Sequence, residues 1–247
     1  MRLQKWPIFL GLLLIVLSAL IYYFHYLIFY DAHHIFIYLL SDIAFVPIEV
    51  LLVTLILHQL LAYREKKGRL EKMNMVIGTF FSEIGTRLLV LFSDFDPKLE
   101  YIKKNLVITN EWTDEEFVKV EKKLRGYEYN VEISKVDFEH LRNLMLEKKE
   151  FLIRLLENPN LLEHENFTNI LWGIFHLAEE LTARKKIKDL PKTDLEHMAG
   201  DIKRFYGQLV YQWLDYMKHL KDNYPYLFSL AMRTNPFDES ASAEVHG

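Results

Sequence analysis

The stretch that decides the fold is PIFLGLLLIVLSALIYYFHYLIFYDAHHIFIYLLSDIAFVPIEVLLVTLILHQLLA, residues 7–62. It contains two apolar runs, residues 7–30 and 35–62, which are separated only by DAHH. Each run exceeds the ~20 residues that a helix needs to cross a hydrocarbon core of about 30 Å. A signal peptide would have a shorter apolar core followed by small residues, whereas bulky aromatic residues continue the first run. The sequence therefore predicts a transmembrane helical hairpin.

Basic residues beside the two runs predict its orientation. Arg2 and Lys5 precede the first run, and the connection between the runs has no Lys or Arg. A basic collar follows the second run and consists of Arg64, Lys66, Lys67, Arg69 and Lys72. Because basic flanks stay on the cytoplasmic side, we expect two spans with both termini cytoplasmic, in the plasma membrane of a prokaryotic cell. The collar either binds anionic lipid headgroups or serves only to set the topology.

Three ionisable side chains inside the apolar runs are candidate polar sites of the predicted hairpin: His25, Asp42 and Glu49. A hairpin that turned about Ala32 and His33 would bring His25 level with Asp42, so we expect these two side chains to be in contact. Glu49 would find no comparable partner, and a charge at its depth costs about 2.5 kcal/mol or more. We therefore expect a neutral Glu49 to join a second copy or another membrane protein. A proton or ion path through several copies is the alternative.

An amphipathic helix is predicted for MNMVIGTFFSEIGTRLLVLF, residues 73–92. Gly78 and Gly85 are seven residues apart and would lie on one stripe, which indicates a close helix crossing because glycine costs a helix about 1 kcal/mol relative to alanine. Glu83 and Arg87 would pair across one helical turn. The apolar face could join the core of the following domain, an oligomeric coiled coil or the membrane surface, in that order of preference.

Helix signals continue through residues 94–235. Capping motifs begin helices at Thr113, Ser134 and Thr193, apolar residues recur at helical spacing, and no alternating strand pattern competes. The expected fold is therefore all-α, and residues 94–235 should fold on their own. The expected parts are a transmembrane hairpin (1–62), a juxtamembrane amphipathic helix (63–93), a cytosolic helical bundle (94–235) and a disordered tail (236–247).

The bundle also has histidine and carboxylate spacings that superficially resemble helical metal sites. His176 is followed by Glu179 and Glu180, and Asp194 precedes His197 by three residues. A histidine at the rim of the core explains His176 more simply, so no metal is expected.

The remaining motifs and the composition exclude several classes of function. The commonest nucleotide-binding, zinc-protease and serine-hydrolase motifs do not occur, so we predict no catalytic residue and no cofactor. The chain has no cysteine, which excludes disulfides and thiolate chemistry. A formal net charge of −4 gives no basis for nucleic-acid binding. The lipid bilayer and a second copy or a membrane protein are the partners expected.

Three stretches, MNMVIGTFFSEIG (73–85), NPNLLEHENF (158–167) and YPYLFSLAMRTNPF (224–237), resemble those of uncharacterised prokaryotic two-span membrane proteins with a cytosolic helical domain. The resemblance covers most of the chain and implies no activity. The function favoured by the sequence is a two-pass membrane protein whose cytosolic domain serves protein interaction, scaffolding or sensing. The alternative is a subunit of a small oligomeric channel or transporter that uses Glu49, and the third hypothesis is a metal-dependent helical-bundle enzyme.

Overall fold

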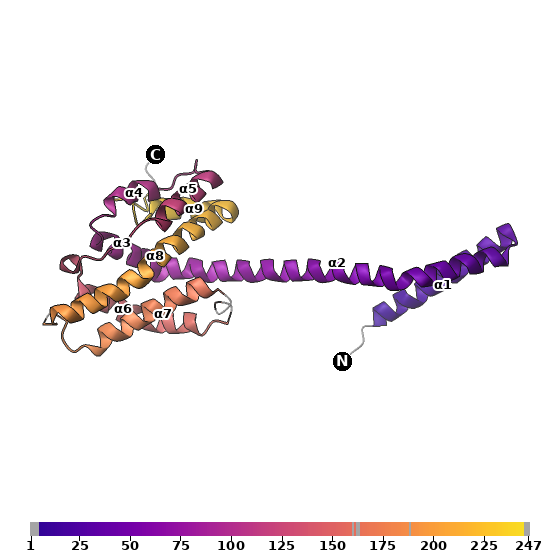
Figure 1. The fold of residues 1–247 in the computed structure, drawn as a ribbon, viewed down its shortest axis with the longest axis horizontal. Helices are drawn as coiled ribbons and strands as arrows, with labels where there is room; N and C mark the ends of the chain where they lie inside the picture. The colour runs from indigo at the N-terminus through magenta and orange to yellow at the C-terminus, as the bar shows by residue number, and fades with distance from the viewer. Residues whose placement is uncertain (1–4, 160, 162–163, 188, 245–247) are drawn as a thin grey trace. The chain divides into compact units, whose positions relative to one another are not determined.

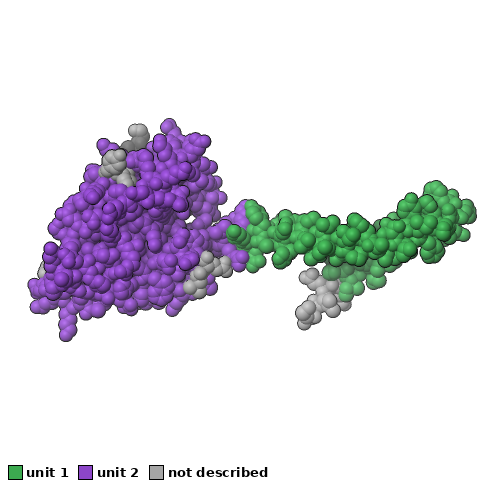
Figure 2. Space-filling view, in the orientation of Figure 1, with its two compact units in different colours: residues 1–66 green, residues 67–247 purple. Residues whose placement is uncertain are grey.

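The computed structural model describes residues 5–159, 161, 164–187 and 189–244. Arg2, on which the predicted orientation rests in part, lies outside these residues. The described residues form helices joined by turns, and none of them lies in a β-strand, which confirms the all-α class. The chain divides into two compact units, Met1–Lys66 and Lys67–Gly247 (Figure 2).

The first unit is a helical hairpin. Helix α1 spans Lys5–Phe29, and α2 spans Ala32–Phe80, of which the part up to residue 66 belongs to this unit (Figure 1). Only two residues connect the helices. Tyr30 has a φ of 50°, and the Asp31 carboxylate accepts a hydrogen bond from the His34 backbone N–H at 3.1 Å. A left-handed residue followed by a capping carboxylate produces the reversal.

The reversal lies earlier in the chain than the sequence predicts, and this changes the neighbour of His25. Because the turn is centred on Tyr30 and Asp31, the His25 ring stacks on that of His34, with the ring planes 2° apart and the centroids 6.3 Å apart. The expected contact between His25 and Asp42 is therefore corrected to one between His25 and His34.

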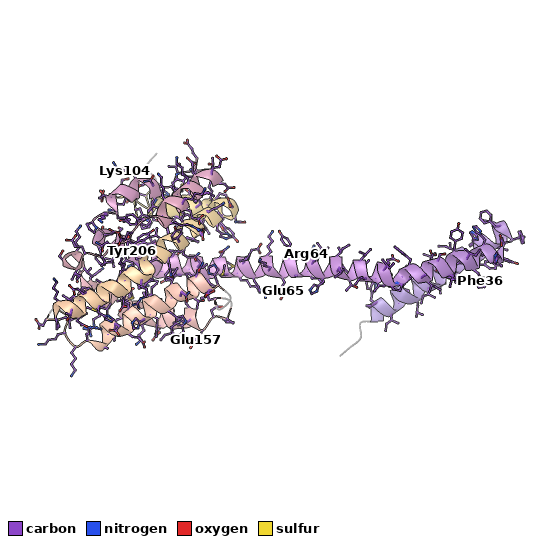
Figure 3. All side chains as sticks on the ribbon, viewed as in Figure 1. Phe36, Arg64, Glu65, Lys104, Glu157 and Tyr206 are labelled. Atoms are coloured by element: carbon purple, nitrogen blue, oxygen red, sulfur yellow. The ribbon has the colours of Figure 1, made fainter. Side chains whose placement is uncertain are left out.

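Apolar side chains of the hairpin are exposed along both helices. Each helix contains a stretch that is long and apolar enough to cross a membrane, by length and composition, and these stretches are 0 % buried. Phe36, for example, is 67 % exposed, and the side chains around it project from α2 (Figure 3). Among the described residues of the hairpin, no side chain reaches the burial of those in the core of the second unit.

The second unit begins with the last turns of α2. One π-helical turn, η1 (Phe81–Gly85), follows and leads into α3 (Thr86–Phe95). The other helices are α4 (Glu100–Leu106), α5 (Asp114–Arg125), the 3₁₀ helix η2 (Ile133–Lys135), α6 (Phe138–Leu156), α7 (Glu165–Ala183), α8 (Lys192–Asn223) and α9 (Pro225–Arg233). Helix α7 packs against both α6 and α8 (Figure 1).

The amphipathic segment 73–92 lies in the core of this unit, which is the first of the three alternatives. The Phe80 ring is fully buried and packs edge-on against Phe167 of α7, and Phe92 packs against Phe205 and Tyr206 of α8. The predicted boundary at residue 93 therefore does not separate two parts, since the compact unit starts at residue 67. The apolar face needs α7 and α8 to cover it.

The π-helical turn changes which side chains the two glycines pack against, compared with the prediction. A Cβ on Gly78 would lie 3.3 Å from the Tyr216 ring of α8, as expected at a helix crossing. A Cβ on Gly85 would instead meet Phe80 and Phe81 of its own chain segment, at 2.6 and 2.7 Å. Because η1 lies between them, the glycines do not share one contact.

The same turn redirects the predicted Glu83–Arg87 pair. The Glu83 carboxylate lies 2.9 Å from Lys148 Nζ, and Arg87 Nη1 lies 3.5 Å from the Glu147 carboxylate. Both partners belong to α6, so these charges link two parts of the domain.

Side-chain capping explains several helix starts. Thr113 and Glu116 form the predicted capping box of α5. Helix α6 is capped by Asp137 rather than Ser134, which lies in η2, and α8 begins at Lys192, after Pro191. Pro191 is the N-cap residue of α8, and since proline is tolerated at the start of a helix but not in its interior, its position fits a helix that begins at Lys192.

The packed domain extends into the predicted tail. Phe237 is buried, with its ring 4.9 Å from that of Trp213, and the Asn235 side chain donates to the Leu106 carbonyl at 2.8 Å. The beginning of the tail is therefore part of the core, and its last three residues, 245–247, lie outside the described part of the chain.

Candidate functional site

The polar residues predicted inside the hairpin do not form one site. Asp42 and Glu49 are both exposed on α2, seven residues apart and so on nearly the same face. His25 lies near the turn, and its Nδ1 is buried without a hydrogen-bond partner. The cations of the basic collar are all exposed on α2. The hairpin therefore presents a carboxylate face and a basic collar.

A compact group of ionisable side chains forms where α7 and α8 face each other. We call it the α7–α8 cluster; it comprises His176 and Glu180 of α7 and His197 and Asp201 of α8. Both pairs have i,i+4 spacing, so each pair points from one side of its helix. The Asp201 Oδ2 atom lies 3.4 Å from His197 Nε2 and 3.7 Å from His176 Nε2. His197 Nε2 is 4.0 Å from Glu180 Oε2.

Asp201 is the unusual member of the cluster. Its side chain is only 2 % exposed, whereas those of His176 and His197 are 48 % and 52 % exposed. Both carboxylate oxygens are buried without a hydrogen bond, although Oδ1 lies 3.1 Å from Arg204 Nη1. Burying an ionised carboxylate costs several kcal/mol because it loses its contacts with water. Nearby cations or hydrogen-bond donors must compensate this cost. The surrounding imidazoles and guanidinium therefore have an electrostatic role.

Arg184 fixes the adjoining end of the cluster. Its guanidinium binds Asp194 through two hydrogen bonds of 2.6 and 2.7 Å, and it donates to Glu180 Oε2 at 2.6 Å. These hydrogen bonds hold the pKa of Glu180 and the pKa of Asp194 below their usual range. Glu180 is thus ionised and held in place at neutral pH.

The sequence identified part of this cluster. It singled out His176 and Glu180, but it treated His176 as a rim histidine, and it named Glu179, which is exposed and takes no part in these contacts. Asp201 was missed. The available signal was the matching pair of spacings, H-x-x-x-E and H-x-x-x-D, on two helices. Among the described residues, no group of three or more histidine, aspartate or glutamate side chains is arranged so that it could hold a metal ion.

A second group of polar side chains surrounds Asp96. This buried carboxylate accepts hydrogen bonds from the Tyr127 hydroxyl and from the backbone N–H groups of Lys98 and Asn130, at 2.8–3.2 Å. With these partners Asp96 ties together two loops, which is a structural role. The hydroxyls of Tyr129 and Tyr206 are buried without partners, and burial raises the pKa of both.

An open pocket of about 700 Å³ lies beside these tyrosines. It is lined by side chains from α5, α7, α8 and the loop after α5, among them Tyr129, Tyr211 and Asp215. Burial raises the pKa of Asp215. Acidic and basic groups are mixed around the pocket, so its charge favours no one class of ligand.

Comparisons with known proteins give the family but not an activity. Residues 2–61 match the family model "MJ1433, N-terminal helical domain", and residues 69–233 match "Uncharacterized protein MJ1433, C-terminal helical domain". The division between the two matches falls near the boundary between the two units. The chain is 48 % identical over 238 residues to "Uncharacterized protein MJ1433" of Methanocaldococcus jannaschii, with 96 % of each chain covered. No solved structure matches. The chain therefore belongs to the MJ1433 family of two-part helical proteins.

Proposed function

We propose that this chain is a two-pass membrane protein whose hairpin anchors the helical domain of residues 67–244 at the cytoplasmic face of the membrane, where the domain serves interaction or sensing. The observation that carries the proposal is the exposure of the apolar hairpin, whose two candidate spans are 0 % buried.

Exposure argues against a soluble hairpin. Water-soluble monomers rarely present contiguous apolar patches larger than a few hundred Å². Here apolar side chains are exposed around both helices, from Trp6 to Tyr63. A helix in the core of a soluble protein would meet the same test of length and composition, but it would be buried. A bilayer removes this surface from water.

The continuity of α2 supports retention of the hairpin. A signal sequence has one short apolar run before its cleavage site. In this chain the second run follows after only four residues, and its helix continues to Phe80, whose ring is fully buried in the domain core. The second run is therefore part of an element on which the domain depends.

The proposed orientation rests on the charges at the ends of the hairpin. The basic collar is exposed on α2, and the connection at Tyr30 and Asp31 carries no cation. Retention of basic flanks in the cytoplasm would place the turn outside and the domain inside the cell.

An interaction role is supported by large side chains on the domain surface. Trp172 of α7 and Tyr226 of α9 are 56 % and 72 % exposed. Aromatic side chains of this kind are enriched at the centres of protein interfaces. A partner that covered them would remove apolar area from water.

Fractionation tests the proposal. We expect the full chain to stay in the membrane pellet after a wash with alkaline carbonate and to be released by detergent. The fragment 67–244, with the same tag, serves as the matched control and should be in the supernatant. Release of the full chain by carbonate would contradict integral insertion.

The interaction role is tested separately, by crosslinking in native membranes. Trp172→Ala and Tyr226→Ala should weaken a crosslinked product that the full chain forms, while leaving the protein in the pellet. If both variants crosslink as the unmodified chain does, these side chains are not the contact surface.

A further inference from the structure

We infer that the open pocket of about 700 Å³ beside Tyr129 binds an uncharged, planar organic molecule. One edge of this molecule carries a hydrogen-bond donor and a hydrogen-bond acceptor side by side, as the edges of lactams and nucleobases do. The inference concerns the helical domain alone and does not depend on the membrane proposal. Nothing in the family descriptions assigns such a site.

The first step is the buried amide of Gln212. This residue of α8 is only 7 % exposed, and the described residues offer its side chain no hydrogen bond. Buried polar groups are nearly always hydrogen-bonded, because an unpaired one costs free energy. Since Gln212 lines the pocket, a bound molecule can supply the missing partner. The amide has N–H donors and a carbonyl acceptor, so its complement is an edge that offers one of each.

Two further polar side chains extend this surface along α8. Gln208 and Asp215 also line the pocket, four residues before and three residues after Gln212, and so lie on the same face of the helix. Among the described residues, neither side chain has a hydrogen bond or an ion pair. Burial raises the pKa of Asp215, as expected for a carboxyl group that no cation contacts. A ligand therefore meets several unpaired donors and acceptors at once.

Tyrosine rings form part of the pocket wall. The Tyr129 ring packs edge-on against Tyr206, and Gly207 leaves it room, since a Cβ there would lie 2.9 Å from the Tyr129 ring. The Tyr211 hydroxyl donates to the Glu121 carbonyl at 3.1 Å, which holds this side chain at the pocket. Aromatic walls favour flat ligands, because rings pack well on one another. The volume is also within the range of roughly 300–1,000 Å³ that is common for small-molecule sites.

The charges around the pocket favour an uncharged ligand. Three cations line it, and each already lies beside a carboxylate: Arg125 beside Glu121 at 2.6 Å, Lys203 beside Glu128 at 3.6 Å and Arg204 beside Asp201 at 3.1 Å. An anionic ligand would have to break one of these pairs, and a cationic ligand would lie among the three cations. The competing interpretation is that water in the open pocket satisfies the Gln212 amide, with no ligand, and the experiment distinguishes the two.

The test uses the full chain purified in detergent and saturation-transfer NMR. The probes are uracil and hypoxanthine, and their controls are 1,3-dimethyluracil and 1-methylhypoxanthine, in which methyl groups replace the N–H donors of the lactam edge. We expect saturable transfer to at least one probe and weaker transfer to its methylated form. Gln212→Leu should weaken binding of that probe by tenfold or more, because it removes both the donor and the acceptor.

Asn143→Leu is the matched control, since it removes an exposed amide of α6 that does not line the pocket, and it should leave binding unchanged. Gln212→Leu should also keep or raise Tm, because it removes a buried polar group without a partner. A clearly lower Tm would overturn the inference, as Gln212 would then have a structural role. Absence of transfer to both probes would overturn it in favour of a hydrated amide. Unchanged affinity in Gln212→Leu, or equal binding of the methylated probes, would overturn it too.

Discussion

Gly85, at the end of the π-helical turn, has no room for a side chain. A Cβ there would lie 2.6 Å from Phe80 Cε1 and 2.7 Å from Phe81 Cδ1, and both rings are buried. Overpacking of this kind costs about 1–3 kcal/mol, so Gly85→Ala should lower the free energy of unfolding by that amount. Gly200→Ala is the control: its Cβ would meet nothing within 4 Å, and it should stabilise α8 by up to about 1 kcal/mol. Equal denaturation midpoints for the two variants would contradict this packing.

His219 gives the domain a pH dependence. Burial lowers the pKa of His219 below its ordinary value of 6.5, and its Nδ1 lies 3.0 Å from the Asn74 amide nitrogen. A folded-state pKa below the unfolded value means that the stabilising contribution is present above about pH 6.5 and is lost as the pH falls below it. We expect Tm to fall in this range, and to fall less in His219→Gln, which keeps a polar acceptor. Identical pH profiles would show that another group is responsible.

At the scale of single residues, the sequence indicated which residues are unusual better than it indicated which residues are in contact. It drew attention to His176 because apolar residues surround it, and to Glu180 because its spacing from His176 resembles that of helical metal sites. It could not identify Asp201, because H-x-x-x-D looks like any polar face until the packing of α7 against α8 buries the carboxylate. The contact of His25 was predicted wrongly for a similar reason: a shift of the turn by about two residues changes every pairing in a hairpin.

At the scale of elements, the segment that precedes residue 94 is essential to the domain. It contributes fully buried large side chains, and each contributes about 1.5–3 kcal/mol by burial. They include Ile77, Phe80, Ile84, Leu88 and Phe92. Their sum is comparable to the ~5–15 kcal/mol net stability of a typical domain.

Two fragments test this dependence. Residues 67–244 should melt cooperatively when followed by circular dichroism, whereas residues 94–244 should aggregate or show no cooperative transition. The sequence-based expectation that residues 94–235 fold alone is revised accordingly. Cooperative melting of the shorter fragment at the same temperature would contradict the assignment of residues 73–92 to the core.

Substitutions of Glu49 test whether the hairpins of different copies associate through this side chain. It is exposed on an apolar helix, where a neutral carboxyl can hydrogen-bond to a second copy. Glu49→Gln keeps shape and donor, so crosslinked oligomers should persist in native membranes; Glu49→Leu removes both, so they should decrease. Loss of ion flux in Glu49→Gln with intact oligomers would favour the channel alternative instead. If Glu49→Leu changes neither property, Glu49 has no role in association.

The presence of the helices could be predicted well because apolar periodicity and caps are local signals. Thr113, for example, caps α5 as predicted. The π-helical turn η1 could not, since it lies within an uninterrupted helical pattern and only the packed Phe80, Phe81 and Gly85 reveal it. The pairing of Glu83 and Arg87 with α6 follows from the same turn.

For the whole molecule, composition already separates the two units. Exposed apolar side chains dominate residues 6–62, whereas charged and apolar residues alternate at helical spacing beyond them. The two family matches divide the chain at nearly the same place. What composition does not give is the role of the shared helix α2, whose last turns belong to the core of the second unit.

Site-specific labelling tests the membrane topology, the central claim, most directly. The chain has no cysteine, so single cysteines can be introduced by His33→Cys near the turn and Ala243→Cys near the C-terminus. In intact cells we expect a membrane-impermeant maleimide to label His33→Cys and not Ala243→Cys, and to label both once the membrane is permeabilised. Labelling of Ala243→Cys in intact cells, or failure to label His33→Cys there, would contradict a two-pass hairpin with both termini in the cytoplasm.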